Sequence, residues 1–394
     1  MSITNCPQTN IAFSDCADLV NIYNLSNGNN WNLNDGWGTE ANGNLWSGIT
    51  LHPNGEVRVI NLPFNNMNGQ LPPTLNGLNR LEVLNLNFNL LGDQLPPDLA
   101  DMAQLRELRL SRNDFNGDIN DNNEFPDWLS TISSLQVLEI QDHRFAGQFP
   151  DNIGALVNLR ELRIDNFNPA PFPDLRQLQQ LEILDLSSSL LVGSIPNWIG
   201  ELGSLEVLDL QDSNLSGVLP ESLTELEHLR ELRLGFNALS GRLPINLGDL
   251  TALQVLSIPS SPFNGRFLSG PLPDSLTQLT QLVELNLFWQ GISGPLPINL
   301  GAMGALRELN LVGNELTDSL PSSVTQLQLN EFFISANFFA SDETLQLQLS
   351  PAQSSWYSTL AETVYLWPEI GPVLGVFDSL DQRESPILFR DRFH

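Results

Sequence analysis

Histidine and cysteine, the side chains that most often ligate transition metals or act as nucleophiles, are scarce in this sequence. The four histidines are His52, His143, His228 and His394, and no two of them have the spacing of a zinc motif such as His-Glu-x-x-His. No Gly-x-Ser-x-Gly sequence, which would expose a serine nucleophile on a sharp turn, occurs either. We therefore predict that the protein is not an enzyme and that it holds no cofactor.

Carboxylates are abundant instead. Aspartate and glutamate number 46 against 17 basic residues, all of them arginine, and the formal net charge is −29. A field this negative repels phosphate groups, so nucleic acids and anionic membrane surfaces are poor partners. Cationic proteins, metal ions and neutral glycans remain open as partners.

One polar segment has the alternating oxygen ligands that a calcium ion prefers. Its members are Asp114, Asn116, Asp118, Asn120, Asn122 and Glu124. The glycine in the middle of a calcium loop is absent, and the glutamate comes one position early. We interpret the segment as a solvated loop, with a calcium site as the alternative, and predict no metal site.

The chain repeats a Leu-x-x-Leu-x-Leu sequence, and most neighbouring copies start 24 residues apart, as do Leu81 and Leu105. Each copy continues through a turn into Leu-x-Gly-x-Leu-Pro, as in Leu215–Pro220. The starts are Leu81, Leu105, Leu135, Leu159, Leu181, Leu205, Leu229, Leu253, Leu282 and Leu306, with weaker copies at Val57 and Leu329. Self-similarity at this period predicts about twelve stacked units over residues 57–340.

Each unit predicts its own local structure. Alternating leucines form a short strand with leucines inside, and equivalent strands must pair in parallel. Eight residues after the start stands an inward polar residue that can bond to backbone groups in the turn, usually asparagine, as at Asn89 and Asn237. Acidic residues after Leu-Pro suit the start of a short helical turn, namely Asp127, Asp151, Asp174, Glu221 and Asp274.

The Gly-x-Leu-Pro sequence after each strand resembles the plant-type leucine-rich repeats of receptor ectodomains and polygalacturonase-inhibitor-like proteins, with similar arrays in bacteria and algae. The stretch from Asp18 to Tyr23, followed by Trp31, Trp37 and Trp46, is similar to the N-terminal cap of that family. Leu51 stands where the family usually has a cysteine. The resemblance implies an α/β repeat solenoid, a curved right-handed superhelix with a parallel sheet on the concave face.

We accordingly divide the chain into an N-terminal cap (1–56), leucine-rich repeats (57–340) and a C-terminal cap with a tail (341–394). The only two cysteines, Cys6 and Cys16, lie close together, and we predict a disulfide between them, two buried thiols being the alternative. No apolar run is long enough for a membrane helix, and the N-terminus lacks a signal-peptide pattern. We predict an extracellular or cell-surface monomer.

Three repeats depart from the period after their strands. Extra residues occur around Asn120–Phe125 and around Arg266–Ser269, and Asn168–Pro173 replaces Leu-x-Gly-x-Leu-Pro. These departures leave the sheet intact and reshape only loops. Partner-specific loops and neutral drift both explain them.

Two columns of outward residues define the predicted concave surface. Four positions after the start, opposite charges follow one another at Arg109, Glu139, Arg163 and Asp185, and again at Asp209 and Arg233. We interpret this column as a charge ladder, in which the opposite charges of adjacent strands pair with one another and need no external partner.

Seven positions after the start, aromatic residues recur, and carboxylates lie nearby. The candidate partner-binding residues are Asp212, Phe236, Phe288 and Trp289, with a lesser patch at Phe64 and Phe88. Such a surface suits sugar stacking or a protein hot spot, and ordinary exposed apolar surface is the alternative.

The predicted function is non-catalytic binding of a protein, peptide or glycan on the concave face. The alternatives are a secreted inhibitor of a cell-wall-degrading enzyme and a calcium- or surface-binding structural protein.

Overall fold

The computed structural model of the chain describes residues 11–37, 46–115, 125–145, 152–167, 170–261, 268–334 and 336–339. The chain divides into two compact units, Met1–Asp342 and Glu343–His394, and all described residues belong to the first.

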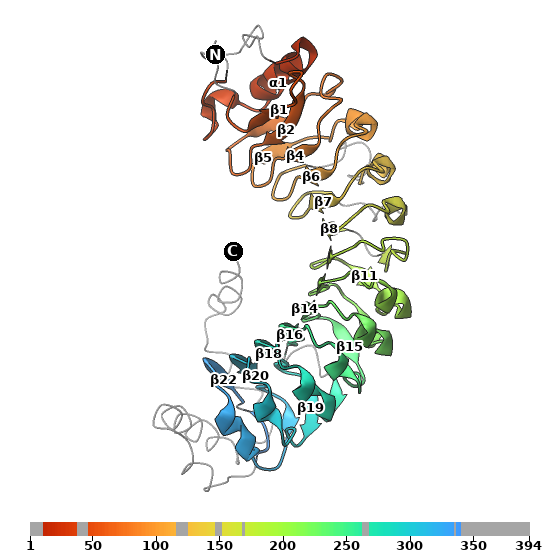
Figure 1. Cartoon of the computed structure of the whole chain (residues 1–394), viewed down its shortest axis with the longest axis vertical. Helices are drawn as coiled ribbons and strands as arrows, with labels where there is room; N and C mark the ends of the chain where they lie inside the picture. Colours follow the sequence, from red (N-terminus) through yellow and green to blue (C-terminus); the bar gives the residue numbers. More distant parts are fainter. Residues whose placement is uncertain are drawn as a thin grey trace, which may run out of the picture. The chain divides into compact units, whose positions relative to one another are not determined.

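One 13-stranded sheet runs through this first unit and lines the inner side of its arc (Figure 1). Its first strand, β1 (Ile49–Leu51), is antiparallel to β2 (Val57–Asn61). The others follow in parallel as β4 (Val83–Asn85), β6 (Glu107–Arg109), β7 (Val137–Ile140), β8 (Glu161–Ile164), β10 (Ile183–Asp185), β12 (Val207–Asp209), β14 (Glu231–Arg233), β16 (Val255–Ser257), β18 (Glu284–Asn286), β20 (Glu308–Asn310) and β22 (Glu331–Phe333). The predicted leucine-rich-repeat solenoid with a long parallel sheet is confirmed.

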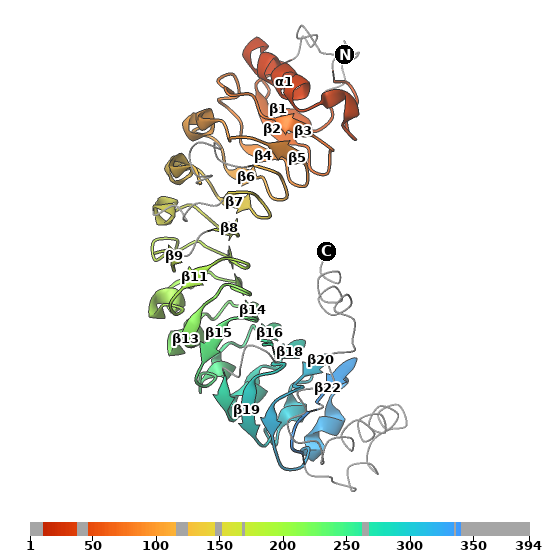
Figure 2. The same cartoon turned by 180° about the vertical axis from the view of Figure 1, so that it is seen from behind.

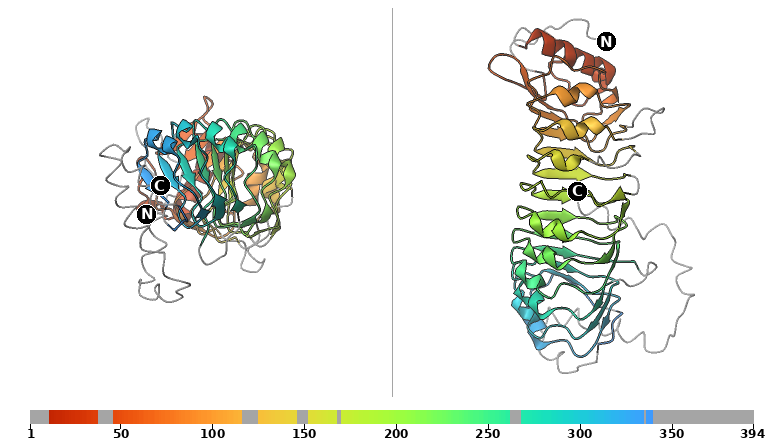
Figure 3. Two further views of the ribbon diagram at one scale, coloured as in Figure 1. Left: turned by 90° about the horizontal axis from the view of Figure 1, so that it is seen from below. Right: turned by 90° about the vertical axis from the view of Figure 1, so that its right-hand side faces the viewer.

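Pairing in this sheet joins equivalent positions of successive repeats, so every column of the sequence becomes a row across the strands (Figure 3). Leu184 pairs with Leu208 and Asp185 with Asp209 in register. Leu184 and Leu208 are both fully buried, because side chains alternate between the two faces of a strand and the leucines point into the core. The leucines therefore form one continuous core, and the residues between them line the inner face.

The Leu-x-Gly-x-Leu segments and the segments that replace them form additional short strands, where the sequence predicted only a turn (Figure 2). These strands are β3 (Asn68–Gln70), β5 (Leu90–Gly92), β9 (Ala170–Pro171), β11 (Leu191–Val192), β13 (Ser216–Val218), β15 (Ala238–Ser240), β17 (Ser269–Gly270), β19 (Gly291–Gly294) and β21 (Glu315–Leu316), paired in small parallel sheets. The repeat glycine has a left-handed backbone here, with φ +83° at Gly217, which a Cβ would strain.

Short 3₁₀ helices form the outer side of the arc (Figure 1). They are η2 (Pro97–Asp101), η3 (Asp127–Thr131), η4 (Ile153–Ala155), η5 (Asn197–Glu201), η6 (Glu221–Glu225), η7 (Leu247–Asp249), η8 (Asp274–Gln278), η9 (Leu300–Ala302) and η10 (Ser322–Gln326). Asp127, Glu221 and Asp274 stand in first turns, as the sequence predicted. The prediction is wrong for Asp174, which begins no helix and pairs with Arg176 at 2.7 Å. Asp151 lies outside the described residues.

The inward asparagines bond the backbone of neighbouring repeats together. Asn89 Nδ2 donates to the carbonyl oxygens of Leu62 and Leu86, both at 2.9 Å. Its Oδ1 accepts from the backbone N–H groups of Asn65 and Met67, both at 3.0 Å. Asn89 thus satisfies four buried backbone groups that the turn leaves without a backbone partner.

The N-terminal end of the solenoid is covered by α1 (Phe13–Leu25) and η1 (Gly28–Asn30); α1 is longer than the predicted helical stretch. Trp31 and Trp37 pack edge to face with ring centroids 4.8 Å apart, and Trp46 is fully buried beside them. Cys16 on α1 is buried and disulfide-bonded. Cys6 lies outside the described residues, so the pairing of the two stays a prediction. Among the described helices, none is long and apolar enough to cross a membrane.

Candidate functional site

The inner face of the 13-stranded sheet is open in the described part of the chain. The 3₁₀ helices η2–η10 all lie behind the sheet, and no described element of the repeats packs on its inner side (Figure 1). Most repeats therefore present the outward residues of the strand and of the following turn to solvent, whereas Asp185, Ser257 and Ser260 are buried. These residues are the candidate binding surface.

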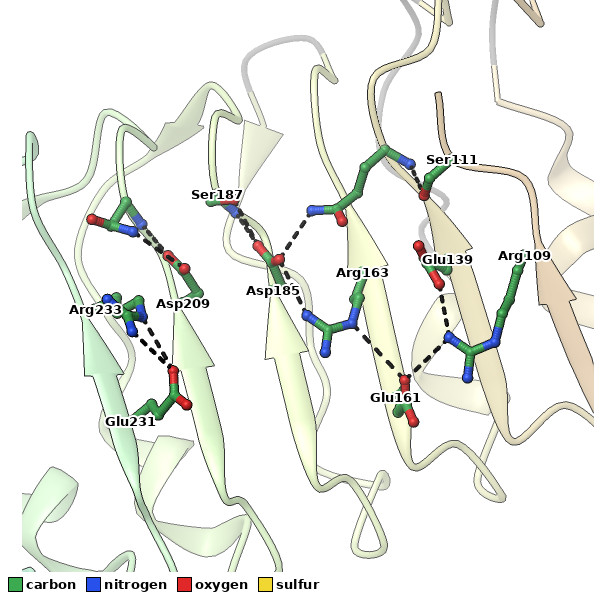
Figure 4. A network of polar contacts seen from close by, with 12 residues as sticks. Arg109, Ser111, Glu139, Glu161, Arg163, Asp185, Ser187, Asp209, Glu231 and Arg233 are labelled. Atoms are coloured by element: carbon green, nitrogen blue, oxygen red, sulfur yellow. Dashed lines mark hydrogen bonds and ion pairs between the residues drawn. The ribbon is translucent and has the colours of Figure 1, made fainter. Parts of the chain in front are cut away.

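The middle of this face carries a network of ion pairs across the strands (Figure 4). Arg109 pairs with Glu139 on the next strand at 2.8 Å and reaches Glu161, two strands away, at 3.5 Å. Arg163 pairs with Asp185 at 3.5 Å and with Glu161 at 3.9 Å. These partly exposed arginines are engaged by the fold itself, and pairs of this exposure each contribute about 0.2–1 kcal/mol.

At Asp209 and Arg233 the opposite charges act on each other across the strands, and each residue also has a partner on its own repeat. The two residues are in register, but Arg233 bonds Glu231 of its own strand at 3.2 Å. Asp209 Oδ1 accepts the backbone N–H of Gln211 at 3.0 Å. Burial, with Asp185 nearby, raises the pKa of Asp209 to about 6. The sequence missed this arrangement because it compared only one column of charges.

A buried histidine and a buried aspartate meet at the edge of the same face. The backbone N–H of Phe145 donates to His143 Nδ1 at 2.9 Å, so the ring proton is on Nε2 and is donated to the carbonyl oxygen of Asp165 at 3.0 Å. Burial lowers the pKa of His143 to about 4 and raises the pKa of Asp165 to about 7. His143 is thus a neutral structural group in the place of the repeat asparagine.

The column seven positions after each start has an unusual backbone. Ten non-glycine members of this column have a positive φ of 50–58°: Phe64, Phe88, Arg112, Asp142, Asn166, Ser188, Asp212, Phe236, Trp289 and Ala336. Asparagine and glycine adopt this left-handed conformation most readily, and other residues do so at a cost of about 1–2 kcal/mol. Aromatic side chains here are therefore unfavourable choices for the fold.

At the N-terminal end of this column the side chains stack on one another. The rings of Phe64 and Phe88 are stacked with centroids 4.0 Å apart and an interplanar angle of 17°. The Arg112 guanidinium lies 4.9 Å from the centroid of Phe88 and bonds Asp142 at 2.9 Å. The structure thus brings Phe64 and Phe88 together, and it adds Arg112 and Asp142, which the sequence did not single out.

Further along the column the predicted residues form a looser group. Phe288 and Trp289 pack edge to face with centroids 6.0 Å apart, and the Trp289 indole lies against Gly313, where a Cβ would come within 2.5 Å of its ring. Asp212 and Phe236 occupy the same turn position of adjacent repeats, and both are exposed. Ser260, the equivalent residue between Phe236 and Trp289, is buried and lacks the positive φ.

Other predicted features are only partly covered. Of the polar segment from Asp114 to Glu124, residues 116–124 lie outside the described residues, as do residues 266 and 267 of the second insertion. Among the residues that the structure describes, no three histidine, cysteine or carboxylate side chains group as metal ligands.

Replacing Phe236 with asparagine tests whether this aromatic serves the fold. Phe236 is 47% exposed, so the substitution removes about half of the burial of a phenylalanine, worth about 1 kcal/mol. It also removes the left-handed strain, worth a similar amount. We expect the free energy of unfolding to change by less than about 1 kcal/mol in urea titrations. Phe145→Ala, at a fully buried position, should instead cost about 3–5 kcal/mol. Equal losses at the two positions would show that Phe236 is a core residue.

Comparison with known proteins agrees with this geometry. A leucine-rich repeat region model matches residues 166–342, and a leucine rich repeat model matches residues 80–102. No curated protein has a sequence that matches the chain.

Several solved structures are similar. A TDR receptor is 28% identical with a TM-score of 0.65, over 71% of this chain and 47% of that one. The plant peptide hormone receptor RGFR1 in complex with RGF2 is 26% identical with a TM-score of 0.62, over 75% and 53%. The Arabidopsis receptor kinase HAESA, in complex with the peptide hormone IDA and the co-receptor SERK1, is 29% identical with a TM-score of 0.63, over 75% and 52%.

This chain spans about half the length of those receptor chains. The repeats matched by both models, the long parallel sheet and the similarity to plant receptor ectodomains lead to one conclusion: the chain is a leucine-rich-repeat solenoid.

Proposed function

We propose that the protein is a non-catalytic, extracellular binding protein that takes a segment of a partner protein on the inner face of its sheet. The observation that carries this proposal is the set of exposed aromatic side chains held in left-handed turns beside that open face. Phe64 is 61% exposed and Phe236 is 47% exposed, so neither is explained by burial. The repeat imposes the left-handed turn at this position, and an exposed aromatic side chain is an unfavourable choice for it, so we assign these side chains to binding.

The similar receptors support a peptide as the partner. Two of them were solved with peptide hormones bound, RGFR1 with RGF2 and HAESA with IDA. A rigid face of parallel strands also suits an extended ligand, because it offers one new set of side chains about every 4.8 Å. A glycan stacked on the aromatic rings is the competing ligand.

Pull-downs from the native medium, run beside a glycan array, test the proposal with Trp289→Ala and Phe236→Ala. Aromatic hot spots contribute about 2 kcal/mol or more to the free energy of binding, so each substitution should lower the affinity for the partner at least about tenfold. Ile298→Ala is the matched control, because this exposed isoleucine precedes η9 on the outer side. A captured protein that is lost from both variants and kept by the control supports the proposal. Capture of the same protein in equal amount by both variants contradicts the proposal. Glycan binding that is lost in Trp289→Ala would show that the ligand is a sugar and not a peptide.

A further inference from the structure

The inner face changes its charge balance beyond β14. The strands β6, β8 and β14 each contain one arginine, Arg109, Arg163 and Arg233 respectively. All three arginines form ion pairs with carboxylates of this face (Figure 4). The next three strands, β16, β18 and β20, contain no basic residue. Arg307, directly before β20, donates instead to the carbonyl oxygens of Gly304 and Leu306 at 3.0 and 2.8 Å. These three strands therefore supply no cation of their own to balance their carboxylates.

Two glutamates face each other across these strands. Glu284 on β18 and Glu308 on β20 are in register, on strands about 4.8 Å apart. Like charges in directly opposed positions destabilise a sheet. Among the described residues neither carboxylate forms an ion pair, and Glu284 accepts a side-chain hydrogen bond from Ser257. Burial raises the pKa of Glu284, and the charge of Arg233 offsets this only in part. The fold therefore keeps two like charges opposed on its inner surface, with Glu308 exposed and Glu284 partly buried.

Aromatic side chains border the same strands. Phe288 and Trp289 follow β18, and Phe333 on β22 is 48% exposed. Phe333 pairs in register with Asn310 of β20, and Asn310 with Asn286 of β18. Carboxylates near the beginning of the strands and aromatic rings toward their ends thus share one open sheet face.

We propose that the inner face of β16–β22 binds a cationic, extended segment of a partner protein. An arginine or lysine of that segment would pair with Glu284 and Glu308, and neighbouring apolar side chains would contact Phe288, Trp289 and Phe333. Charge complementarity selects this partner, because one cation placed between two opposed carboxylates relieves their repulsion and gains charge-assisted hydrogen bonds. This inference rests on the proposed function and adds the chemistry of the ligand.

The test is selection of a phage-displayed library of linear 12-residue peptides on the full chain. The strongest peptide is then synthesised and titrated at low and at high salt against the wild type and two variants. The first is Glu284→Gln/Glu308→Gln. The second, Glu221→Gln/Asp274→Asn, removes the same two charges from exposed residues of the outer 3₁₀ helices and serves as the matched control.

Selected peptides should be enriched in arginine or lysine next to apolar residues. Their affinity should fall about tenfold in Glu284→Gln/Glu308→Gln, should change less than about twofold in the control, and should weaken with salt. Both variants should fold, since the first removes a repulsion.

Neutral or acidic peptides, or equal losses in the two variants, overturn the inference. If such peptides still lose affinity with Trp289→Ala, the proposed function stands and only the cationic ligand is wrong. If no selected peptide depends on Trp289, Phe236 or Glu284, the proposed function fails as well.

Discussion

Replacing Asn237 with alanine is expected to destabilise the protein by about 3–5 kcal/mol. Asn237 Nδ2 donates to the carbonyl oxygens of Leu210 and Leu234 at 2.6 and 3.0 Å. Its Oδ1 accepts from the backbone N–H groups of Ser213 and Leu215 at 3.1 and 2.9 Å. The substitution leaves four buried backbone groups without partners, and each unsatisfied group costs about 1–3 kcal/mol before the turn relaxes.

Serine at the same position should be tolerated better than alanine. Ser213 already occupies the equivalent site one repeat earlier, where its Oγ donates to the carbonyl oxygen of Leu186 at 2.7 Å. Urea unfolding of Asn237→Ala, Asn237→Ser and the exposed control Ser216→Ala measures the order of their free energies of unfolding. Serine should lie between wild type and alanine, and the control should lie within about 0.5 kcal/mol of wild type. A loss below about 1 kcal/mol for alanine would contradict a structural role for the asparagine.

Lowering the pH from about 8 to about 5 is expected to raise the free energy of unfolding by about 2–3 kcal/mol. The pKa values of Asp165 and Asp209 are raised to about 7 and about 6, chiefly by burial, from an ordinary value of 3.8. Between these values the folded state binds protons that the unfolded state does not, so acid stabilises the fold. The stabilisation is lost as the pH rises through 6 and 7.

His143 opposes part of this effect. Its pKa is lowered to about 4, so below about 6.5 the unfolded chain binds a proton that the folded chain excludes. The net rise should therefore be clearest between pH 8 and 6.5, where Asp165 takes up its proton.

Urea unfolding at several pH values, with Asp165→Asn and Asp209→Asn, measures these contributions. Each variant should be more stable than wild type at pH 8, and its free energy of unfolding should depend less on pH than that of the wild type. The outer-face variant Glu221→Gln should keep the slope of the wild type. Stability that is constant or falls between pH 8 and 6.5 would show that Asp165 is ionised at no cost.

The sequence predicted those parts of the fold that depend on which residues are buried. Leucines at fixed spacing placed the strands and their parallel register, because only one register keeps Leu184 and Leu208 in the core. The inward asparagines were equally predictable, since a buried amide such as Asn89 must bond to the backbone. The second set of strands was missed because their residues do not alternate between buried apolar and exposed polar side chains, as in β13, which contains no buried residue.

The site was predictable only in outline. The aromatic column was visible in the sequence, but Phe236 and Trp289 carry no signal of a left-handed backbone, which glycine or asparagine would have given. The guanidinium of Arg112 above Phe88 depends on side-chain directions that spacing does not fix. The opposed Glu284 and Glu308 could have been found by comparing the residues two positions after Leu81 and its equivalents with their neighbours on either side.

Oxidative footprinting of the full chain with its selected 12-residue peptide can locate the binding surface, because it measures the solvent access of named side chains. Bound peptide should protect Phe236, Trp289 and Phe333 on the inner side from modification and should leave Ile298 and Ile245 beside the outer helices as reactive as before. Protection of the isoleucines with unchanged reactivity of the three aromatic residues would contradict binding on the inner face.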